Sequence, residues 1–168
     1  MSEQNTRISF FTLFFALFII ASAAFMRQLT EYIKYWTGEK GFTFLIHLLF
    51  LFAVIVVLVF IRRARSFIRR FTIFLLLCVG LYFTSQIKIA VERVHILEYA
   101  ILEWLVIRDL AKTRRAREIL KPSLFCAIVG VIDEIFQAIL PYRFFDFRDI
   151  LFNCIGGIWG GWLFLLGD

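Results

Sequence analysis

The chain has 168 residues, of which 61% are apolar and only 19% are charged, and its formal net charge is +6. A soluble domain averages about 45–50% apolar and about 25% charged residues, so this composition excludes an ordinary soluble enzyme, a disordered protein and a disulfide scaffold. Each membrane span needs about 20 residues, and five or six spans would use most of the chain. We therefore expect an integral membrane protein without a separate soluble domain.

Six apolar runs predict six membrane helices. In chain order they cover residues 8–26, 43–61, 71–83, 89–107, 122–140 and 150–166. Small residues at 21–24 are also typical of a signal-peptide cleavage site, but the first run is long enough to span, and we favour a retained helix. Pro122 fits the first turn of the fifth helix, and Pro141 ends it. The predicted fold is an all-α polytopic bundle of about six transmembrane helices, or five if the first is cleaved.

The basic residues predict the orientation of this bundle. They cluster in the short connections at residues 62–70 and 108–121. With the N-terminus inside, twelve of the 19 Lys and Arg residues lie on the inner side and seven on the outer side. By the positive-inside rule, both termini of this multi-pass protein face the cytoplasm. We interpret the clusters as topology signals that contact anionic lipid, not as a nucleic-acid interface.

Polar residues on the last three predicted helices are the main functional signal. The fourth carries Glu92, Arg93, His95, Glu98 and Tyr99, the fifth Asp133, Glu134 and Gln137, and the sixth Asp149 and Asn153, with Arg143 in the connection before it. Helical spacing places most of each set on one face, and the orientation above places all three sets just beneath the outer surface. A charged side chain at the centre of a span costs about 2.5–3.5 kcal/mol. These groups must therefore face protein or a hydrated cavity.

Glycines in the sixth predicted helix indicate close helix packing. Gly156–Gly160 and Gly157–Gly161 are overlapping GxxxG pairs, which let another helix backbone approach.

At these residues the chain resembles the VanZ-like family of bacterial membrane proteins. The resemblance rests on the ordered set Glu92-Arg93-Val94-His95-Ile96-Leu97-Glu98-Tyr99, Asp133-Glu134-Ile135-Phe136-Gln137, Arg143, Asp149 and Asn153-Cys154-Ile155-Gly156. The pair Glu92-Arg93 departs from the commoner Asp-Lys, and the first two helices carry no matching motif. We expect a single membrane domain with helices one to three in residues 1–87 and a VanZ-like core in residues 88–161. The family takes its name from a protein associated with resistance to the glycopeptide teicoplanin.

One hypothesis is an outward-facing site that acts on a cell-envelope molecule, such as a lipid-linked intermediate. His95 would be a general acid or base oriented by Glu92 or Glu98, while Asp133 or Glu134 would exchange protons. Arg93 and Arg143 would hold an anionic group of the ligand. Further candidate contacts are Tyr99, Gln137, Asp149 and Asn153.

Two alternatives stay open at this point, so the sequence does not decide whether the protein is an enzyme. The polar residues could form a non-catalytic network that packs helices and binds a lipid or a protein partner. They could also serve an ion- or proton-coupled carrier. The spacing Glu92-x-x-His95 suits a di-metal bundle, but a second such pair is missing, and we expect neither metal nor cofactor. The oligomeric state is not encoded in any pattern of the sequence.

Overall fold

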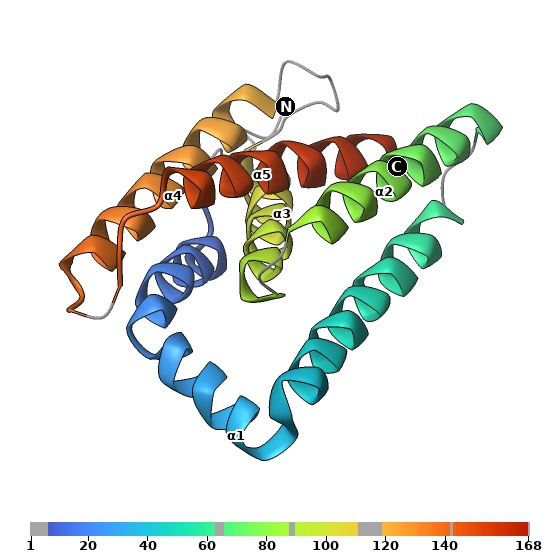
Figure 1. The fold of residues 1–168 in the computed structure, drawn as a ribbon. Helices are drawn as coiled ribbons and strands as arrows, with labels where there is room; N and C mark the ends of the chain where they lie inside the picture. The colour runs from blue at the N-terminus through green and yellow to red at the C-terminus, as the bar shows by residue number, and fades with distance from the viewer. Residues whose placement is uncertain (1–6, 63–65, 88–89, 111–118, 142, 168) are drawn as a thin grey trace. The chain divides into compact units, whose positions relative to one another are not determined.

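The structure is a computed structural model that describes residues 7–62, 66–87, 90–110, 119–141 and 143–167. Over this part of the chain it contains helices and no strand, which confirms the all-α prediction. The helices are α1 (Phe10–Ile61), α2 (Phe67–Gln86), α3 (Ala90–Leu110), α4 (Leu120–Ile139) and α5 (Phe147–Gly167) (Figure 1). Residues 63–65 and 111–118 of the predicted basic clusters lie outside the described residues.

The described residues form five helical elements where about six helices were predicted, because the first two predicted helices meet at a kink within α1 without a loop between them. Residues 27–42, expected to form a connection, are helical apart from Gly38. The first part of this segment includes Arg27, Gln28, Leu29, Glu31 and Lys34, which are good helix formers. The direction of α1 changes at Gly38, whose φ of 71° and ψ of 168° lie outside the helical region (Figure 1). Glycine adopts this conformation at little cost because it lacks a Cβ atom.

Four of the helices are long and apolar enough to cross a membrane, namely α1, α2, α4 and α5. Most of their apolar side chains point away from the protein, as hydrocarbon-facing residues do. α3 is not among them, because it carries Glu92, Arg93, Glu98, Glu103, Arg108 and Asp109. The protein is thus a multi-pass membrane protein with one helix of much higher polarity.

The chain divides into two compact units. Unit 1 consists of the described residues of Met1–Ala24 and of His95–Leu165, and unit 2 of those of Phe25–Val94 and of Leu166–Asp168. In unit 2, the guanidinium of Arg93 donates two hydrogen bonds, of 2.9 and 2.8 Å, to the carbonyl of Ile87. Ile87 is the C-terminal cap of α2, so Arg93 satisfies a carbonyl that this helix end leaves exposed.

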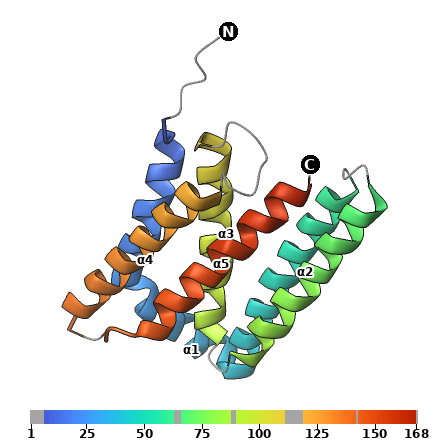
Figure 2. The same ribbon diagram turned by 90° about the horizontal axis from the view of Figure 1, so that it is seen from above.

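α3 is the central helix of unit 1, with Leu102, Leu105 and Val106 at most 1% exposed. The start of α1 and the inner face of α4 pack against it (Figure 2). The shared hydrophobic core consists of Ala16, Ile19, Tyr99, Leu102, Val106, Cys126 and Val129. Because protein surrounds α3 on these sides, its polar groups are kept from lipid.

Asp109 ties the last turn of α3 to the first turn of α1. Its Oδ2 atom accepts hydrogen bonds from the backbone N–H of Ser9 (2.8 Å) and from the hydroxyl of Thr12 (2.6 Å). A backbone N–H at the start of a helix has no partner within the helix, so Asp109 supplies one. This contact fixes the beginning of α1 against the end of α3 within unit 1.

α5 approaches the backbone of α3 through glycines, which confirms the prediction from the GxxxG pairs. A Cβ atom added at Gly156 would lie 2.6 Å from the carbonyl oxygen of Ile96. One added at Gly160 would lie 2.6 Å from the Cα atom of Ala100. Neither position has room for a side chain, so these two glycines set the distance between the helices.

We predict that Gly156→Ala destabilises the protein, whereas the neighbouring change Gly157→Ala does not. The added methyl at Gly156 meets backbone, and such overpacking typically costs about 1–3 kcal/mol. At Gly157 the nearest atoms would be 3.6 Å away, which is ordinary contact, and alanine favours a helix over glycine by about 1 kcal/mol. Thermal unfolding in detergent should give a melting temperature several degrees lower for Gly156→Ala alone; equal values for both variants would contradict the packing described.

Candidate polar site

α4 presents its polar side chains to the protein and its apolar side chains outward. Asp133, Glu134 and Gln137 are at most 3% exposed, while Leu124 and Ile139 are 63% and 74% exposed. This polarity is the reverse of that of a soluble surface helix. It is the arrangement expected when a helix with ionisable residues stands in hydrocarbon.

A histidine and a glutamate on α3 form the partly exposed edge of this polar region. The Nδ1 atom of His95 lies 3.3 Å from the Oε2 atom of Glu98, one helical turn away, and the two side chains are 16% and 18% exposed. Asp133 of α4 and Asp149 of α5 interact electrostatically with His95. The fold therefore brings predicted site residues of α3, α4 and α5 together within unit 1.

We call this region the polar core. It is made up of His95, Glu98, Tyr99, Asp133, Glu134, Gln137, Arg143, Asp149 and Asn153. Tyr99 and Asn153 belong to it because both flank Gly130, where an added Cβ atom would lie 3.3 Å from Asn153 Nδ2 and 3.5 Å from Tyr99 Cε1. Arg143 belongs to it through its electrostatic interaction with Asp149.

Glu134 connects α4 to the start of α5. Its Oε1 atom accepts a hydrogen bond of 2.9 Å from the side-chain amide of Gln137. Its Oε2 atom accepts one of 3.0 Å from the backbone N–H of Asp146. Both oxygens of this buried carboxylate are thus satisfied, and Gln137 and Glu134 together hold the residue that precedes α5.

Asp146 caps the N-terminus of α5. Its carboxylate accepts a hydrogen bond of 2.8 Å from the backbone N–H of Arg148 and forms an ion pair of 2.7 Å with the Arg148 side chain. Hydrogen bonds from Arg148 lower the pKa of the Asp146 carboxyl, which lies between the membrane helices. The carboxylate therefore stays ionised, and the cap persists, to a lower pH than for an isolated aspartate.

Several other buried atoms of the polar core have no hydrogen-bond partner among the described residues. They are both oxygens of Asp133, both amide atoms of Asn153, the hydroxyl of Tyr99, Oδ1 of Asp149 and Nε of Arg143. Asp133 and Asn153 are each 1% exposed and Tyr99 is 0% exposed. An unpaired buried polar atom costs about 1–3 kcal/mol, so these atoms are the ones at which a hydrogen-bonding partner would contribute most.

Glu103 is a buried acid that was not among the predicted site residues. It is 0% exposed, and its Oε1 atom accepts a hydrogen bond of 2.8 Å from the hydroxyl of Ser123 on α4. Its position four residues after Tyr99 on the same helix face was the signal for it in the sequence. Ser123 carried no comparable signal, because a lone serine in an apolar run is common.

Two predicted site residues, Glu92 and Arg93, lie in unit 2. Glu92 stands in the first turn of α3. The guanidinium of Arg93 donates a hydrogen bond to the carbonyl of Ile87, and its Nη1 atom lies 3.3 Å from Nε2 of His47. The guanidinium of Arg93 therefore lies at the C-terminal end of α2, where it caps the helix.

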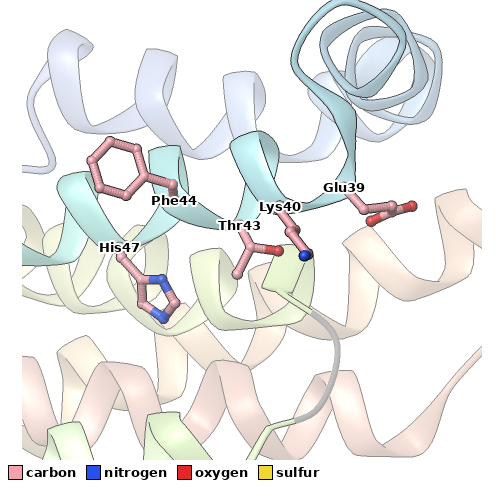
Figure 3. A pocket seen from close by; sticks show the side chains of 5 residues that line it. All are labelled: Glu39, Lys40, Thr43, Phe44 and His47. Carbon is pink, nitrogen blue, oxygen red and sulfur yellow. The ribbon is translucent and has the colours of Figure 1, made fainter.

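A shallow surface depression lies on α1 in unit 2, and one of its lining residues, His47, lies beside Arg93. It is lined by Glu39, Lys40, Thr43, Phe44 and His47, which share one helix face (Figure 3). In the described part of the chain, no group of three or more His, Cys, Asp or Glu side chains has the geometry to hold a metal ion.

A family model described as VanZ/LLP1 matches residues 2–167, which is nearly the whole chain and extends well beyond the motif-bearing region. No curated protein and no solved structure gives a significant match.

We predict that Glu134→Ala loosens the start of α5, whereas Glu134→Gln largely preserves it. Alanine leaves the backbone N–H of Asp146 and the amide of Gln137 without their acceptor, and each loss costs about 1–3 kcal/mol. Glutamine keeps one acceptor oxygen. Hydrogen–deuterium exchange should show faster exchange of the Asp146 amide in the alanine variant, and unchanged exchange would exclude a role of Glu134 in positioning α5.

Proposed function

The chain belongs to the VanZ/LLP1 family, and from this premise we propose that its polar core binds a polar molecule of the cell envelope. The protein resides in the cytoplasmic membrane with both termini inside, and the polar core faces the outer side. The ligand is a lipid-linked or glycan intermediate of the envelope. Through this ligand the protein contributes to glycopeptide resistance of the teicoplanin type.

The observation that carries this proposal is the set of unpaired buried atoms in Asp133, Asn153 and Tyr99. They come from three helices, and the side chains of Tyr99 and Asn153 both lie beside Gly130. A purely structural network would pair such groups with one another, since leaving them unpaired costs free energy. A ligand that forms hydrogen bonds with them recovers that cost on binding.

The graded exposure of the polar core supports an approach route for the ligand. His95 and Glu98 are partly exposed, whereas Asp133 is almost fully buried. A ligand would first meet the His95–Glu98 pair and then reach Asp133 below it. The imidazole and the carboxylate beside it are also able to move a proton, so the same pair would serve a catalytic step on the bound molecule.

The hydrogen-bonded part of the polar core favours a second function, which is to hold the helices in place. Glu134 is bonded both to Gln137 and to the backbone of Asp146. These are the contacts expected of a packing network. We assign this positioning role to Glu134 and Gln137, and the ligand-binding role to Asp133, Asn153 and Tyr99.

The orientation can be tested by labelling the two ends of α4. Phe144, just after α4, is 86% exposed, and Leu120, at its start, is 73% exposed. We predict that Phe144→Cys reacts with a membrane-impermeant maleimide in intact cells, while Leu120→Cys reacts only after permeabilisation. Both variants are made in a cysteine-free background. The reverse pattern would place the polar core on the cytoplasmic side.

The binding function predicts that Asp133→Asn and Asn153→Ala lose the phenotype of the wild type while remaining in the membrane. Asn at 133 keeps the shape of the side chain and removes its charge, and Ala at 153 removes two hydrogen-bonding groups. In cells that lack the chromosomal gene, we expect both variants to show the teicoplanin susceptibility and the lipid-linked intermediates of the deletion strain.

Glu39→Gln is the matched control, because it removes a carboxylate that is 76% exposed in unit 2. It should behave as wild type. Membrane abundance is measured for each variant by immunoblot. Wild-type phenotype in both Asp133→Asn and Asn153→Ala, at normal abundance, would rule out the binding function.

A further inference from the structure

We infer that the ligand of the polar core carries an ammonium group and that its binding displaces a proton from the core. This inference rests on the proposed function and names the chemical class of the ligand. The polar core then binds a cationic group of the ligand, and not the phosphate or carboxylate that the arginines alone would suggest.

The first argument is the balance of ionisable groups. The acids of the polar core are Glu98, Asp133, Glu134 and Asp149, and its bases are His95 and Arg143. Even with both bases charged, four carboxylates would leave an excess of two negative charges. Asp146 and Arg148 neutralise one another at 2.7 Å and do not alter this balance. An anionic ligand would add to the excess, whereas a cation would reduce it.

The second argument is the kind of atom that is unpaired. Both oxygens of Asp133 and Oδ1 of Asp149 are buried without a partner among the described residues. An ionised carboxylate only accepts hydrogen bonds, and an ammonium group offers three donors and no acceptor. Charge-assisted hydrogen bonds of this type are about twice as strong as neutral ones. A phosphate, which brings acceptors, would leave these oxygens unpaired.

The bases of unit 1 support the same conclusion. Among the described residues of unit 1, the polar core has Arg143 as its permanently charged base, and Arg143 already interacts with Asp149. One arginine opposite four acids is a poor site for an anion.

Proton displacement follows from the cost of buried charge. Without a ligand, the excess carboxylates hold protons, because uncompensated buried negative charge is far more costly than a neutral acid. An ammonium group that binds in place of one of these protons releases it, so the ligand binds more tightly as the pH rises. The titratable and charged groups around Asp133 are His95, Glu98 and Tyr99 of α3 and Glu134 of α4, while Arg143, Asp146 and Arg148 surround Asp149 of α5.

The test uses the purified full-length protein in phosphatidylglycerol nanodiscs. Three probes of similar size are compared by calorimetry: ethanolamine, ethylene glycol and inorganic phosphate. Ethanolamine stays charged between pH 6 and 8, so any pH dependence in this range comes from the protein. We expect ethanolamine to bind, with an affinity that rises about tenfold per pH unit for one displaced proton. Ethylene glycol and phosphate should bind at least tenfold more weakly.

Three variants connect this binding to the polar core. Asp133→Asn should weaken ethanolamine binding at least tenfold and flatten its pH dependence. Asn153→Ala should weaken binding but keep the pH dependence, because it removes no carboxylate. Glu98 lies at the partly exposed edge of the polar core. The Glu98→Gln variant therefore tests the charge balance if Asp133→Asn does not fold. In Glu98→Gln, the affinity for ethanolamine should fall while its pH dependence is kept, because three carboxylates still exceed the two bases by one.

The outcomes separate this inference from the proposed function. Tighter binding of phosphate than of ethanolamine, abolished by Asn153→Ala, would overturn the ammonium ligand and leave the binding function standing. Ethanolamine affinity that is constant or falls with rising pH would overturn proton displacement. Binding of none of the three probes would overturn the inference, and the resistance phenotypes above would then decide the proposed function separately.

A second experiment, in nanodiscs of different lipid composition, identifies the source of the ammonium group. In these nanodiscs, phosphatidylethanolamine replaces part of the phosphatidylglycerol. Both lipids carry a phosphate, but only phosphatidylethanolamine carries an amine. A higher melting temperature of the wild type, absent in Asp133→Asn, together with loss of ethanolamine binding, indicates a lipid headgroup. An unchanged melting temperature with ethanolamine binding retained indicates a soluble or glycan-linked amine. Both results uphold the ammonium ligand.

Discussion

Ionisable side chains in a membrane helix need protein around them, and this constraint organises unit 1. α3 carries the largest number of such residues, and it lies at the centre of the unit, with Tyr99 and Glu103 fully buried. Lipid offers no hydrogen bonds, so exposing this helix to hydrocarbon would cost several kcal/mol for each group. The apolar outer faces of α4 and α5, and the start of α1, shield it.

The shielding requires helices to approach closely, and small residues allow it. Gly156 and Gly160 let α5 reach the backbone of α3 at Ile96 and Ala100. Asn153, one turn before Gly156, and Tyr99 both lie beside Gly130 of α4. Packing and polar chemistry are therefore linked, because the contacts that bury α3 also bring hydrogen-bonding groups of three helices together.

Within the polar core, two kinds of buried carboxylate differ in their surroundings. Glu134 has a partner for each oxygen, one of them a backbone N–H at the start of α5. Asp133, the preceding residue, has none among the described residues. Neighbours in sequence point about 100° apart on a helix, so one contacts the connection to α5 and the other faces α3. This difference separates a positioning role from a binding role.

The sequence by itself determined that the protein is an all-helical membrane protein of this family. Hydrophobic run length and composition report directly on the bilayer, and helical periodicity places His95, Asp133 and Asn153 on buried faces. Only the tertiary structure decided that the first two runs share one element bent at Gly38, that Arg93 caps α2, and that Glu134 is paired while Asp133 is not. Such partners depend on where separate helices approach one another, and local sequence does not encode that distance.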